Sequence, residues 1–396
     1  MSSLVGSPDG SLRLHEALVQ HGPAYLERFG ATMPARQRAV LQKLLQCRTA
    51  ALGGALHQCP QCGQRHFTYH SCNDRHCPQC GREESEEWLA AQQALLLPVP
   101  YFLVTFTVPE PLRAWLRSHP ALGYDLLFDA SAQALQDLAG NPKRLGATLG
   151  MLGVLHTWSR TLIHHPHVHF LVAGGGLSRD QRTWVSAKPN FLLPVKALSD
   201  RCRNLFRHTL QKENPEALRQ IPASTWKQRW VVHSAAVGSG ANALRYLSRY
   251  VFKTATGNRA LPVRPDGRLR WRYRDSATRA WRHVDLEPFE LLRRFLQHVL
   301  PRGFHRVRRF GWWHPGGRKK RNRVRALLRQ KPVLTEAEQA AWQPPAGDVP
   351  EPADSQLSTF NSQPLKCARC GAALVLVDRW RPGQRPQWRA QDRAPP

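Results

Sequence analysis

Acidic residues are scarce in this chain of 396 residues, which carries 28 Asp and Glu against 57 Lys and Arg and has a formal net charge of +29. Such an excess of positive charge attracts polyanions, so nucleic acid is the expected partner. Long apolar runs are also missing, because no stretch reaches the roughly 18 apolar residues of a membrane-spanning helix. The best candidate, 95–108, is interrupted by Pro98 and Pro100. The sequence therefore predicts no association with a membrane.

Two sequence signatures are missing as well. Residues 1–13 do not combine a basic start with an apolar core, so we expect no secretion signal and a cytoplasmic location. The chain has no Gly-x-x-x-x-Gly-Lys-Ser/Thr phosphate loop, the motif with which many helicases bind nucleotides. If the protein acts on DNA, strand separation is therefore expected to depend on host replication or helicase proteins.

Cysteine is present in an arrangement typical of metal sites. Six of the nine cysteines form Cys-x-x-Cys pairs, which in a reducing compartment are metal ligands rather than disulfides. Each of the first two pairs is followed by a glycine, which lets the backbone turn so that its amides face the thiolates. These two knuckles predict a structural Zn²⁺ site whose simplest ligand set is Cys59, Cys62, Cys77 and Cys80.

Other ligand sets for zinc remain open, as does a second ion. Cys47 and Cys202 are expected to be ordinary buried residues. The third pair, Cys367 and Cys370, is half of a zinc site and by itself weak support for metal binding. Competing ligands lie close to the two knuckles: Cys72, His66, His70 and His76.

A histidine-rich apolar run, 164–172, is followed by three glycines at 174–176. This pattern predicts a strand, covered on both faces, that ends in a loop. Side chains of a strand alternate between its faces, so His165, His167 and His169 point the same way. Buried ring nitrogens need partners, which favours a divalent-metal site over ordinary buried histidines. The zinc-hydrolase pattern His-x-His-x-Asp-His fits less well, because its acidic residue and last histidine are missing.

The order of the expected elements indicates the fold class. Apolar and β-branched runs predict strands, and apolar residues at helical spacing predict helices. Helix 14–29 is expected to break near Gly22 and Pro23, and Thr32 is expected to cap the next helix, which ends near Cys47. The order predicts an α+β fold, an antiparallel sheet flanked by helices. The strands are expected at 101–108, 149–158, 164–172 and 230–237, and the later helices at 83–97, 122–138, 192–210, 240–253 and 289–299.

The helix expected at 240–253 carries Tyr246 and Tyr250, one turn apart on the same face. Two aromatic residues at this spacing are most often packing residues of an amphipathic helix. A basic stripe runs beside them, and the histidine strand lies upstream, so we interpret the pair as functional. The stripe consists of Arg245, Arg249 and Lys253, which we expect to contact DNA.

Basic residues are concentrated further along the chain. A hairpin expected at 268–273 and 281–286 has a cationic face, which is either a solvated edge or a surface that contacts phosphates. The segment 302–331 has no acidic residue. Basic residues interleaved with aromatic ones suit single strands, where rings stack on bases. The aromatic residues are Phe304, Phe310, Trp312 and Trp313, and the expected DNA-binding cluster is Arg318, Lys319, Lys320 and Arg321.

Several runs between residues 35 and 320 occur in an order that resembles a known family, the two-tyrosine HUH (histidine–hydrophobic–histidine) transposases of the insertion-sequence ninety-one family. A lone His-x-His is a weak signal, whereas the ordered set is specific. The runs are Cys47-Arg-Thr-Ala-Ala-Leu-Gly-Gly54, Arg75-His-Cys-Pro-Gln-Cys80, Leu155-His-Thr-Trp158, His165-Pro-His-Val-His169, Gly174-Gly-Gly-Leu177, Leu193-Pro-Val-Lys196, Tyr246-Leu-Ser-Arg-Tyr250 and Arg294-Phe-Leu-Gln-His-Val-Leu-Pro301.

The resemblance implies a fold, a site and a reaction. It implies an HUH sheet in which His167 and His169 bind Mg²⁺ or Mn²⁺ and Tyr246 and Tyr250 are nucleophiles. These would nick single-stranded element ends and targets through a 5′-phosphotyrosine, in a bacterial protein associated with the nucleoid. A third metal ligand is expected from His165, His156 or a polar side chain on the tyrosine helix, such as Asn242, although His156 is favoured as a core residue or as a neighbour that supports a ligand.

Two alternatives and a domain division complete the predictions. The alternatives are an HUH replication initiator or relaxase, and a zinc-finger protein that binds nucleic acid without catalysis. We expect N-terminal helices at 1–48, a zinc-binding domain at 49–85, the catalytic domain at 86–325, and a Pro-rich linker and partly disordered tail at 326–396.

Overall fold

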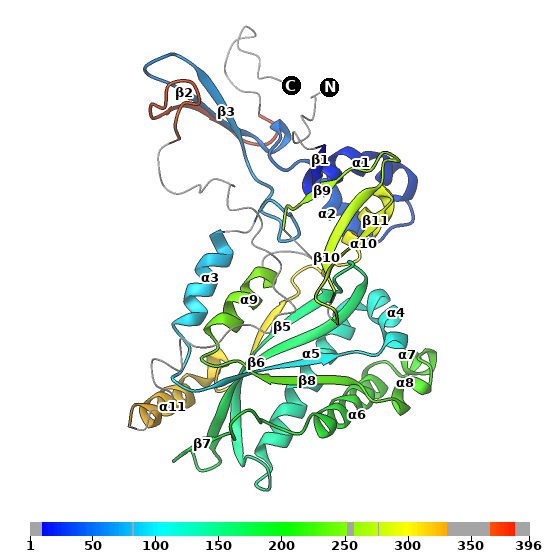
Figure 1. Cartoon of the computed structure of the whole chain (residues 1–396), viewed down its shortest axis with the longest axis vertical. Helices are drawn as coiled ribbons and strands as arrows, with labels where there is room; N and C mark the ends of the chain where they lie inside the picture. Colours follow the sequence, from blue (N-terminus) through cyan, green and yellow to red (C-terminus); the bar gives the residue numbers. More distant parts are fainter. Residues whose placement is uncertain (1–9, 81–82, 252–256, 276, 331–364, 385–396) are drawn as a thin grey trace.

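The computed structural model describes residues 10–80, 83–251, 257–275, 277–330 and 365–384 (Figure 1). Its largest element is a six-stranded antiparallel sheet in the order β12-β5-β6-β4-β8, with β7 paired to β6. Helices flank this sheet, which confirms the predicted α+β class. The strands are β4 (Tyr101–Thr107), β5 (Ala147–Trp158), β6 (His164–Ser178), β7 (Trp184–Ser186), β8 (Val231–Ala236) and β12 (Val307–Gly311).

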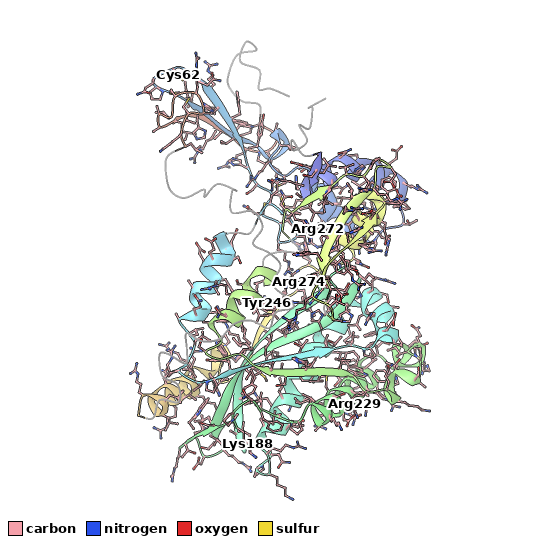
Figure 2. The ribbon with its side chains drawn as sticks, viewed as in Figure 1. Cys62, Lys188, Arg229, Tyr246, Arg272 and Arg274 are labelled. Atoms are coloured by element: carbon pink, nitrogen blue, oxygen red, sulfur yellow. The ribbon has the colours of Figure 1, made fainter. Side chains whose placement is uncertain are left out.

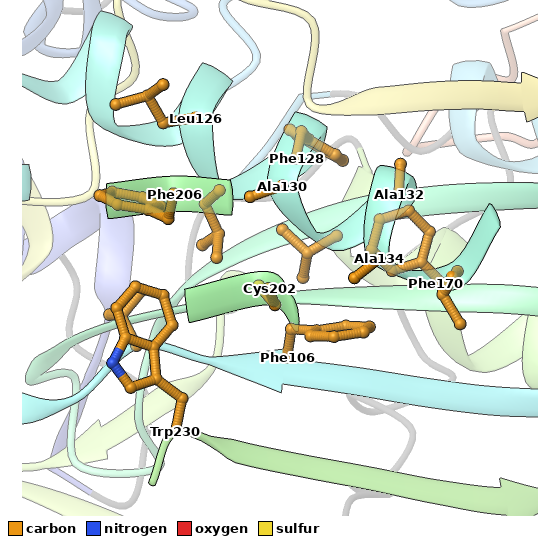
Figure 3. Packing of buried hydrophobic residues seen from close by; sticks show 14 of the residues in the cluster. Phe106, Leu126, Phe128, Ala130, Ala132, Ala134, Phe170, Cys202, Phe206 and Trp230 are labelled. Atoms are coloured by element: carbon orange, nitrogen blue, oxygen red, sulfur yellow. The ribbon is translucent and has the colours of Figure 1, made fainter. Parts of the chain in front are cut away.

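One face of the sheet packs on the longest helices of the chain. Val168, Phe170 and Val172 of β6 belong to this core, to which the helices contribute Phe128 and Phe206 (Figure 3). Burial of such apolar surface is the main source of stability here. The helices on this side are α4 (Glu110–Ser118), α5 (Pro120–Gly140) and α6 (Val195–Glu213), with the short α7 (Pro215–Gln220) and α8 (Ser224–Lys227) beyond them.

The opposite face carries the odd-numbered residues of β6. Leu171 and Ala173 pack there with Leu244 and Leu247, so β6 is covered on both faces as predicted. The same parity puts His165, His167 and His169 on this face. The helices of this side are α3 (Glu83–Gln93), α9 (Ala241–Val251) and α11 (Arg318–Gln330), the last preceded by the 3₁₀ turn η2 (Pro315–Gly317). None of the described helices could cross a membrane.

The prediction that the histidine strand ends at glycines 174–176 is wrong, because β6 continues through them to Ser178. A side chain at Gly174 would lie 2.6 Å from the carbonyl oxygen of Pro100, and one at Gly176 would lie 2.5 Å from that of Thr148. These glycines therefore allow close approach of neighbouring backbone rather than ending the strand.

A second core joins segments from distant parts of the sequence. Leu14, Leu18 and Leu41 of the first helices pack with Leu291 and Phe295, so the described N-terminal helices share their core with later segments. The elements are β1 (Ser11–Arg13), α1 (Leu14–Phe29), α2 (Ala35–Leu45), β9 (Ala260–Pro262), the hairpin β10 (Leu269–Arg274) and β11 (Trp281–Leu286), and α10 (Pro288–Leu296).

Two local predictions for the first helices are wrong. Helix α1 runs unbroken through Gly22 and Pro23. Gly22 instead allows close contact with Leu45, since a Cβ there would lie 2.7 Å from that side chain. The N-cap of α2 is Pro34, without a side-chain hydrogen bond, and not Thr32, whose hydroxyl donates to the carbonyl oxygen of Phe29.

A three-stranded sheet in the order β13-β2-β3 combines the two ends of the chain. Figure 1 shows β13, coloured red-brown, beside the blue hairpin of β2 and β3. The described part of the expected tail, 365–384, therefore pairs with the zinc-binding segment, while 331–364 lies outside the described residues. The elements are η1 (Ala50–Leu52), β2 (Gly54–Gln58), β3 (Arg65–Tyr69) and β13 (Val375–Trp380).

Buried histidines should make the stability of this fold depend on pH. Burial, and then the nearby His164, lower the pKa of His298 to about 3. His298 therefore stays neutral in the folded state at pH values where the same ring in the unfolded chain, with a pKa near 6.5, binds a proton. The unfolding free energy consequently decreases as the pH falls from about 6.5 toward 3. At pH 5 the loss amounts to about 2 kcal/mol for this residue. We expect the unfolding free energy of His298→Gln, followed in urea, to fall by about 2 kcal/mol less than that of wild type between pH 7 and 5. Equal changes in the two proteins would contradict the prediction.

Candidate functional site

Three histidines come together where β5 and β6 pair. The register places His156 opposite His167, and His169 lies two residues further along β6. Their ring centroids are 4.4 Å apart for His156 and His169, 4.8 Å for His167 and His169, and 5.2 Å for His156 and His167. One ring nitrogen from each lies within 4.8 Å of the other two, a spacing at which a single metal ion can bind all three.

Hydrogen bonds orient two of these rings. His167 Nδ1 lies 2.7 Å from the carbonyl oxygen of His165. A carbonyl only accepts, so this nitrogen carries the proton, and Nε2 is the ring nitrogen of His167 that bears the lone pair. His169 Nδ1 lies 2.8 Å from Thr105 Oγ1. His169 Nε2 is buried and has no hydrogen-bond partner among the described residues. Buried polar atoms normally have a partner, so this nitrogen is a candidate metal ligand.

The protonation state also suits a metal. Burial, and then the neighbouring histidines, hold the pKa of His156 and of His169 well below 6.5. The rings are therefore neutral at pH 7, the form that binds a cation. Of the candidate third ligands, His156 belongs to the cluster and His165 does not. Asn242, the other candidate, lies in the first turn of α9.

Tyr246 lies beside the three histidines. Its ring centroid is 6.1 Å from that of His169 and 6.4 Å from that of His156 (Figure 2). Helix α9 packs on the sheet through Leu244 and Leu247, so Tyr246 lies half-buried at the edge of the packed stripe. The ring therefore packs partly against the core and lies close to the histidines.

The other residues predicted on this helix are less completely described. Arg245 is exposed. The side chains of Arg249 and Tyr250 lie outside the described residues, although both positions belong to α9, and Lys253 lies outside them altogether.

The cysteines form two clusters, and the predicted set of Cys59, Cys62, Cys77 and Cys80 is wrong because it takes two members from each. Sulfur atoms of a tetrahedral zinc site lie about 3.8 Å apart. In the first cluster Cys47 Sγ lies 3.6 Å from Cys77 Sγ and 3.7 Å from Cys80 Sγ. This cluster consists of Cys47, Cys72, Cys77 and Cys80, and the second of Cys59, Cys62, Cys367 and Cys370.

The other cysteines and histidines that the sequence offered lie in different environments. Cys47 is not merely buried, whereas Cys202 is buried as predicted. His76 has another role, because its Nδ1 lies 2.7 Å from Asp74 Oδ1 and its Nε2 accepts from the amide of Leu300. His66 and His70 are not members of either four-cysteine group, although His66 Nε2 lies 3.3 Å from Cys367 Sγ of the second. The first knuckle lies in the turn of hairpin β2–β3, and strand β3 leads the chain from there toward the second knuckle, so the two pairs are kept apart. Their spacing in the sequence does not reveal this.

Aromatic residues of the basic segment do not form a stacking surface for bases. Trp312 and Trp313 are each 1% exposed and pack in the core between the sheet and α11, and Phe304 is also buried. The prediction of base stacking by these side chains is therefore wrong. These side chains contribute apolar volume to the core, and their ring faces are not accessible to a base.

The cationic side chains themselves are accessible. Arg318, Lys319 and Lys320 are exposed, while Val324 and Leu328 bury the other side of α11. Burial, and then neighbouring Arg325, Arg309 and Arg318, lower the pKa of Arg321. Such crowding of like charge is relieved by an anion, so this surface suits phosphates.

Two further basic surfaces lie near the start of the histidine strand. Hairpin β10–β11 rests on the turn before β6, where Trp271 Nε1 donates to the carbonyl oxygen of Arg160 at 2.8 Å. Its Arg272 and Arg274 are exposed (Figure 2). A cavity of about 230 Å³ next to this strand is lined by Arg113, Arg117, Arg293 and His164, among others. The sequence did not point to this cavity, because its arginines come from α4 and α10, far apart in the chain.

Two family profiles and two known proteins match large parts of this chain. One family profile, described as a putative transposase, matches residues 150–323, and another, described as a transposase zinc-binding domain, matches residues 17–108. The putative transposase y4qJ of Sinorhizobium fredii is 39% identical over 316 residues, which cover 74% of this chain and 78% of that protein.

A second relative, the transposase for insertion sequence element IS801 of Pseudomonas savastanoi pv. phaseolicola, is 30% identical over 360 residues, covering 85% of this chain and 82% of that protein. No solved structure is significantly similar. The putative-transposase match covers all three clustered histidines and Tyr246, and the zinc-binding match covers both knuckles. The zinc-binding match and the cysteine clusters show an N-terminal domain that binds structural zinc. Taken together, the fold, the two cysteine clusters and these matches show that the chain belongs to the insertion-sequence ninety-one (IS91) family of transposases, with DNA as its partner.

Proposed function

We propose that this transposase nicks single-stranded DNA at element ends and transfers the strand through a 5′-phosphotyrosine, with Tyr246 as a nucleophile. The observation that carries the proposal is the place of the Tyr246 ring, about 6 Å from two rings of the histidine cluster. A phosphate bound at the histidines would lie within reach of the phenol oxygen. Proximity of this kind is a large part of what an enzyme supplies to such a reaction.

The metal ligands of the proposal are His156, His167 and His169. When bound, Mg²⁺ or Mn²⁺ would bind a non-bridging oxygen of the scissile phosphate and stabilise charge that develops there. The chain's own contribution is to orient two of the rings, because Thr105 Oγ1 lies 2.8 Å from His169 Nδ1 and the carbonyl oxygen of His165 accepts from His167 Nδ1. Burial holds the pKa of His156 and of His169 well below 6.5 and so keeps these rings neutral. Nitrogen ligands are less usual for Mg²⁺ than oxygen, so Mn²⁺ is the better ion for a first assay.

The tyrosine chemistry balances without an outside energy source. The Tyr246 oxygen attacks phosphorus in line, the bond to the 3′-oxygen breaks, and the proton lost by the phenol is replaced at that 3′-oxygen through solvent. The phosphodiester is exchanged for a phosphotyrosine ester of similar energy, so rejoining to another 3′-hydroxyl needs no ATP. Tyr250, one helical turn away, would permit a second transfer in the same site.

Basic surfaces around the site would hold the strand. The Arg272 and Arg274 face of the hairpin, the cavity with Arg113 and Arg117, and the exposed α11 residues all present cations without a nearby acidic excess. Contacts of this type are salt-dependent and mostly independent of sequence. They would position a strand, while recognition of the element ends requires further contacts.

The test is a covalent-adduct assay on the full-length protein. Single-stranded DNA carrying one element end, labelled on the 3′ side of the cleavage position, is incubated with the protein and Mn²⁺. We expect a labelled protein band that resists denaturation, and peptide mapping is expected to find the DNA on Tyr246 or Tyr250. The double variant Tyr246→Phe/Tyr250→Phe is expected to lose the adduct because it lacks both phenols.

Three outcomes would contradict the proposal. Cleavage that survives in the double variant, with a free 5′-phosphate, would indicate a hydrolytic nuclease. Binding without cleavage at every Mn²⁺ concentration would indicate a non-catalytic DNA-binding protein. An adduct on a residue other than these tyrosines would place the chemistry elsewhere.

A further inference from the structure

We propose that the chain holds a second structural zinc ion, separate from that of the Cys47 cluster, whose ligands come from both ends of the chain. The ligands are Cys59 and Cys62 from the N-terminal part, and Cys367 and Cys370 from the segment after 331–364. We call this group the terminal clasp. It involves none of the three histidines, so it does not depend on the proposed reaction.

The four sulfur atoms of the terminal clasp have the spacing of a tetrathiolate site. Cys59 Sγ lies 3.3 Å from Cys370 Sγ, and Cys62 Sγ lies 3.6 Å from Cys367 Sγ and 3.7 Å from Cys370 Sγ. All four lie within 4.8 Å of one another. Zinc–sulfur bonds of about 2.3 Å in a tetrahedron separate the sulfurs by about 3.8 Å, so one ion fits this group.

The first knuckle has the backbone turn of a zinc ligand pair. Gly63, at φ +69°, donates its amide to the carbonyl oxygen of Cys59, and the Cys59 amide donates to Gln64. The amides of Cys62 and Gln61 face the Cys59 sulfur, where they stabilise a thiolate.

The second knuckle repeats this pattern position by position. Gly371, at φ +75°, donates to the carbonyl oxygen of Cys367, and the Cys367 amide donates to Ala372. The amides of Cys370 and Arg369 face the Cys367 sulfur. Cys59 and Cys370 are 311 positions apart, yet both pairs adopt the same turn with their sulfurs converging. Coincidence is a poor explanation for two matched turns aimed at one point.

Strand pairing brings the two knuckles to one end of the same sheet. Cys59 follows directly after Gln58, and Gln58 pairs with Val375, the first residue of β13. The arrangement, two knuckles on a three-stranded antiparallel sheet, is that of a zinc ribbon. Figure 2 shows Cys62 at the tip of this sheet, away from the central sheet.

The small sheet has little apolar core of its own. Ala55, Leu56 and Trp380 are buried, but Val375 and Val377 are more than half exposed. A module of this size usually needs a disulfide or a metal to remain folded. The first cluster does not supply this, because its cysteines pack in the core that contains the N-terminal helices. The terminal clasp is therefore a separate metal requirement, and the ribbon is complete only when the C-terminal segment is present.

Zinc content of the full-length protein tests the inference. We expect two zinc ions per chain in wild type, measured by elemental analysis after gel filtration with a reductant present. The variant Cys367→Ser/Cys370→Ser is expected to retain one, while the control Cys202→Ser, at a buried cysteine outside both clusters, is expected to retain two.

A measurement that needs no variant covers the case of poor folding. Wild type loaded with Cd²⁺ is expected to show two cadmium NMR signals, both in the range of four thiolate ligands. The inference would be overturned by one zinc per chain in wild type, by two in the double variant, or by a disulfide between Cys59 and Cys370 under reducing conditions. Loss of both ions from a folded double variant would overturn the independence of the two sites.

Discussion

Replacing His167 with alanine is expected to lower the rate of Mn²⁺-dependent single-strand cleavage about 1,000-fold at saturating DNA. A catalytic metal contributes several kcal/mol of transition-state stabilisation, and about 4 kcal/mol corresponds to a factor of this size. His167 offers its Nε2 to the cluster because its Nδ1 is committed to a backbone carbonyl. Alanine removes the ligand and keeps the backbone of β6. The measurement is a single-turnover rate of adduct formation across a Mn²⁺ titration.

His165→Ala provides the matched control for this prediction. His165 lies two residues away on the same strand, but it is outside the three-histidine group. The backbone carbonyl that orients His167 is still present in this variant. We expect less than about a tenfold change, the size of an indirect effect on a metal site. Similar losses in the two variants would argue against the assignment of His167 as a ligand.

Replacing Cys77 with serine is expected to lower the melting temperature by at least about 10 °C and to remove one zinc ion. Structural zinc contributes roughly 10–16 kcal/mol of folding free energy in small domains. Loss of even about 5 kcal/mol shifts the melting temperature of a domain of 150–250 residues by about 10–20 °C. Cys77 is fully buried in a core shared with the first helices and with α10, so the damage is expected to spread beyond the zinc loop.

The control for the cysteine prediction is Cys202→Ser. Cys202 is also buried, and its sulfur lies 3.5 Å from Ser131 Oγ, which can accept a hydrogen bond from the hydroxyl of the introduced serine. This variant makes the same chemical change in a different core, so it reports the cost of serine without loss of a metal ligand. We expect it to keep its zinc and to melt within about 5 °C of wild type. Calorimetry together with zinc analysis compares the two variants directly, and a Cys77→Ser protein that kept its zinc would contradict the prediction.

The zinc loop is also tied to the rest of the molecule by side chains that bind no metal. Arg75 donates to the carbonyl oxygens of Phe304 and Pro301, and His76 accepts from Leu300. These contacts join the first cysteine cluster to the segment between α10 and β12. The family motif around Arg75 and His76 is therefore explained by packing between distant segments as well as by metal binding.

Local sequence patterns determined much of this protein. Alternation of side chains in 164–172 was enough to predict a histidine strand, and helical spacing was enough to predict a helix that carries Tyr246. The α+β class followed from the order of such elements. These inferences succeeded because strand and helix periodicity are properties of neighbouring residues, which the sequence presents directly. The cysteine knuckles were equally visible, since their turn is formed within five residues.

Tertiary structure alone decided which of these pieces meet. His156 joins His167 and His169 because β5 and β6 pair in one particular register, and a shift by one residue would turn it to the other face. The cysteines divide into two clusters because β13 pairs with β2, which brings Cys370 next to Cys59 although the two are 311 positions apart. Trp312 and Trp313 are buried because α11 covers them, although basic neighbours made them resemble a base-stacking surface. Contacts between distant segments depend on sheet register and helix packing, which no short stretch of sequence encodes by itself.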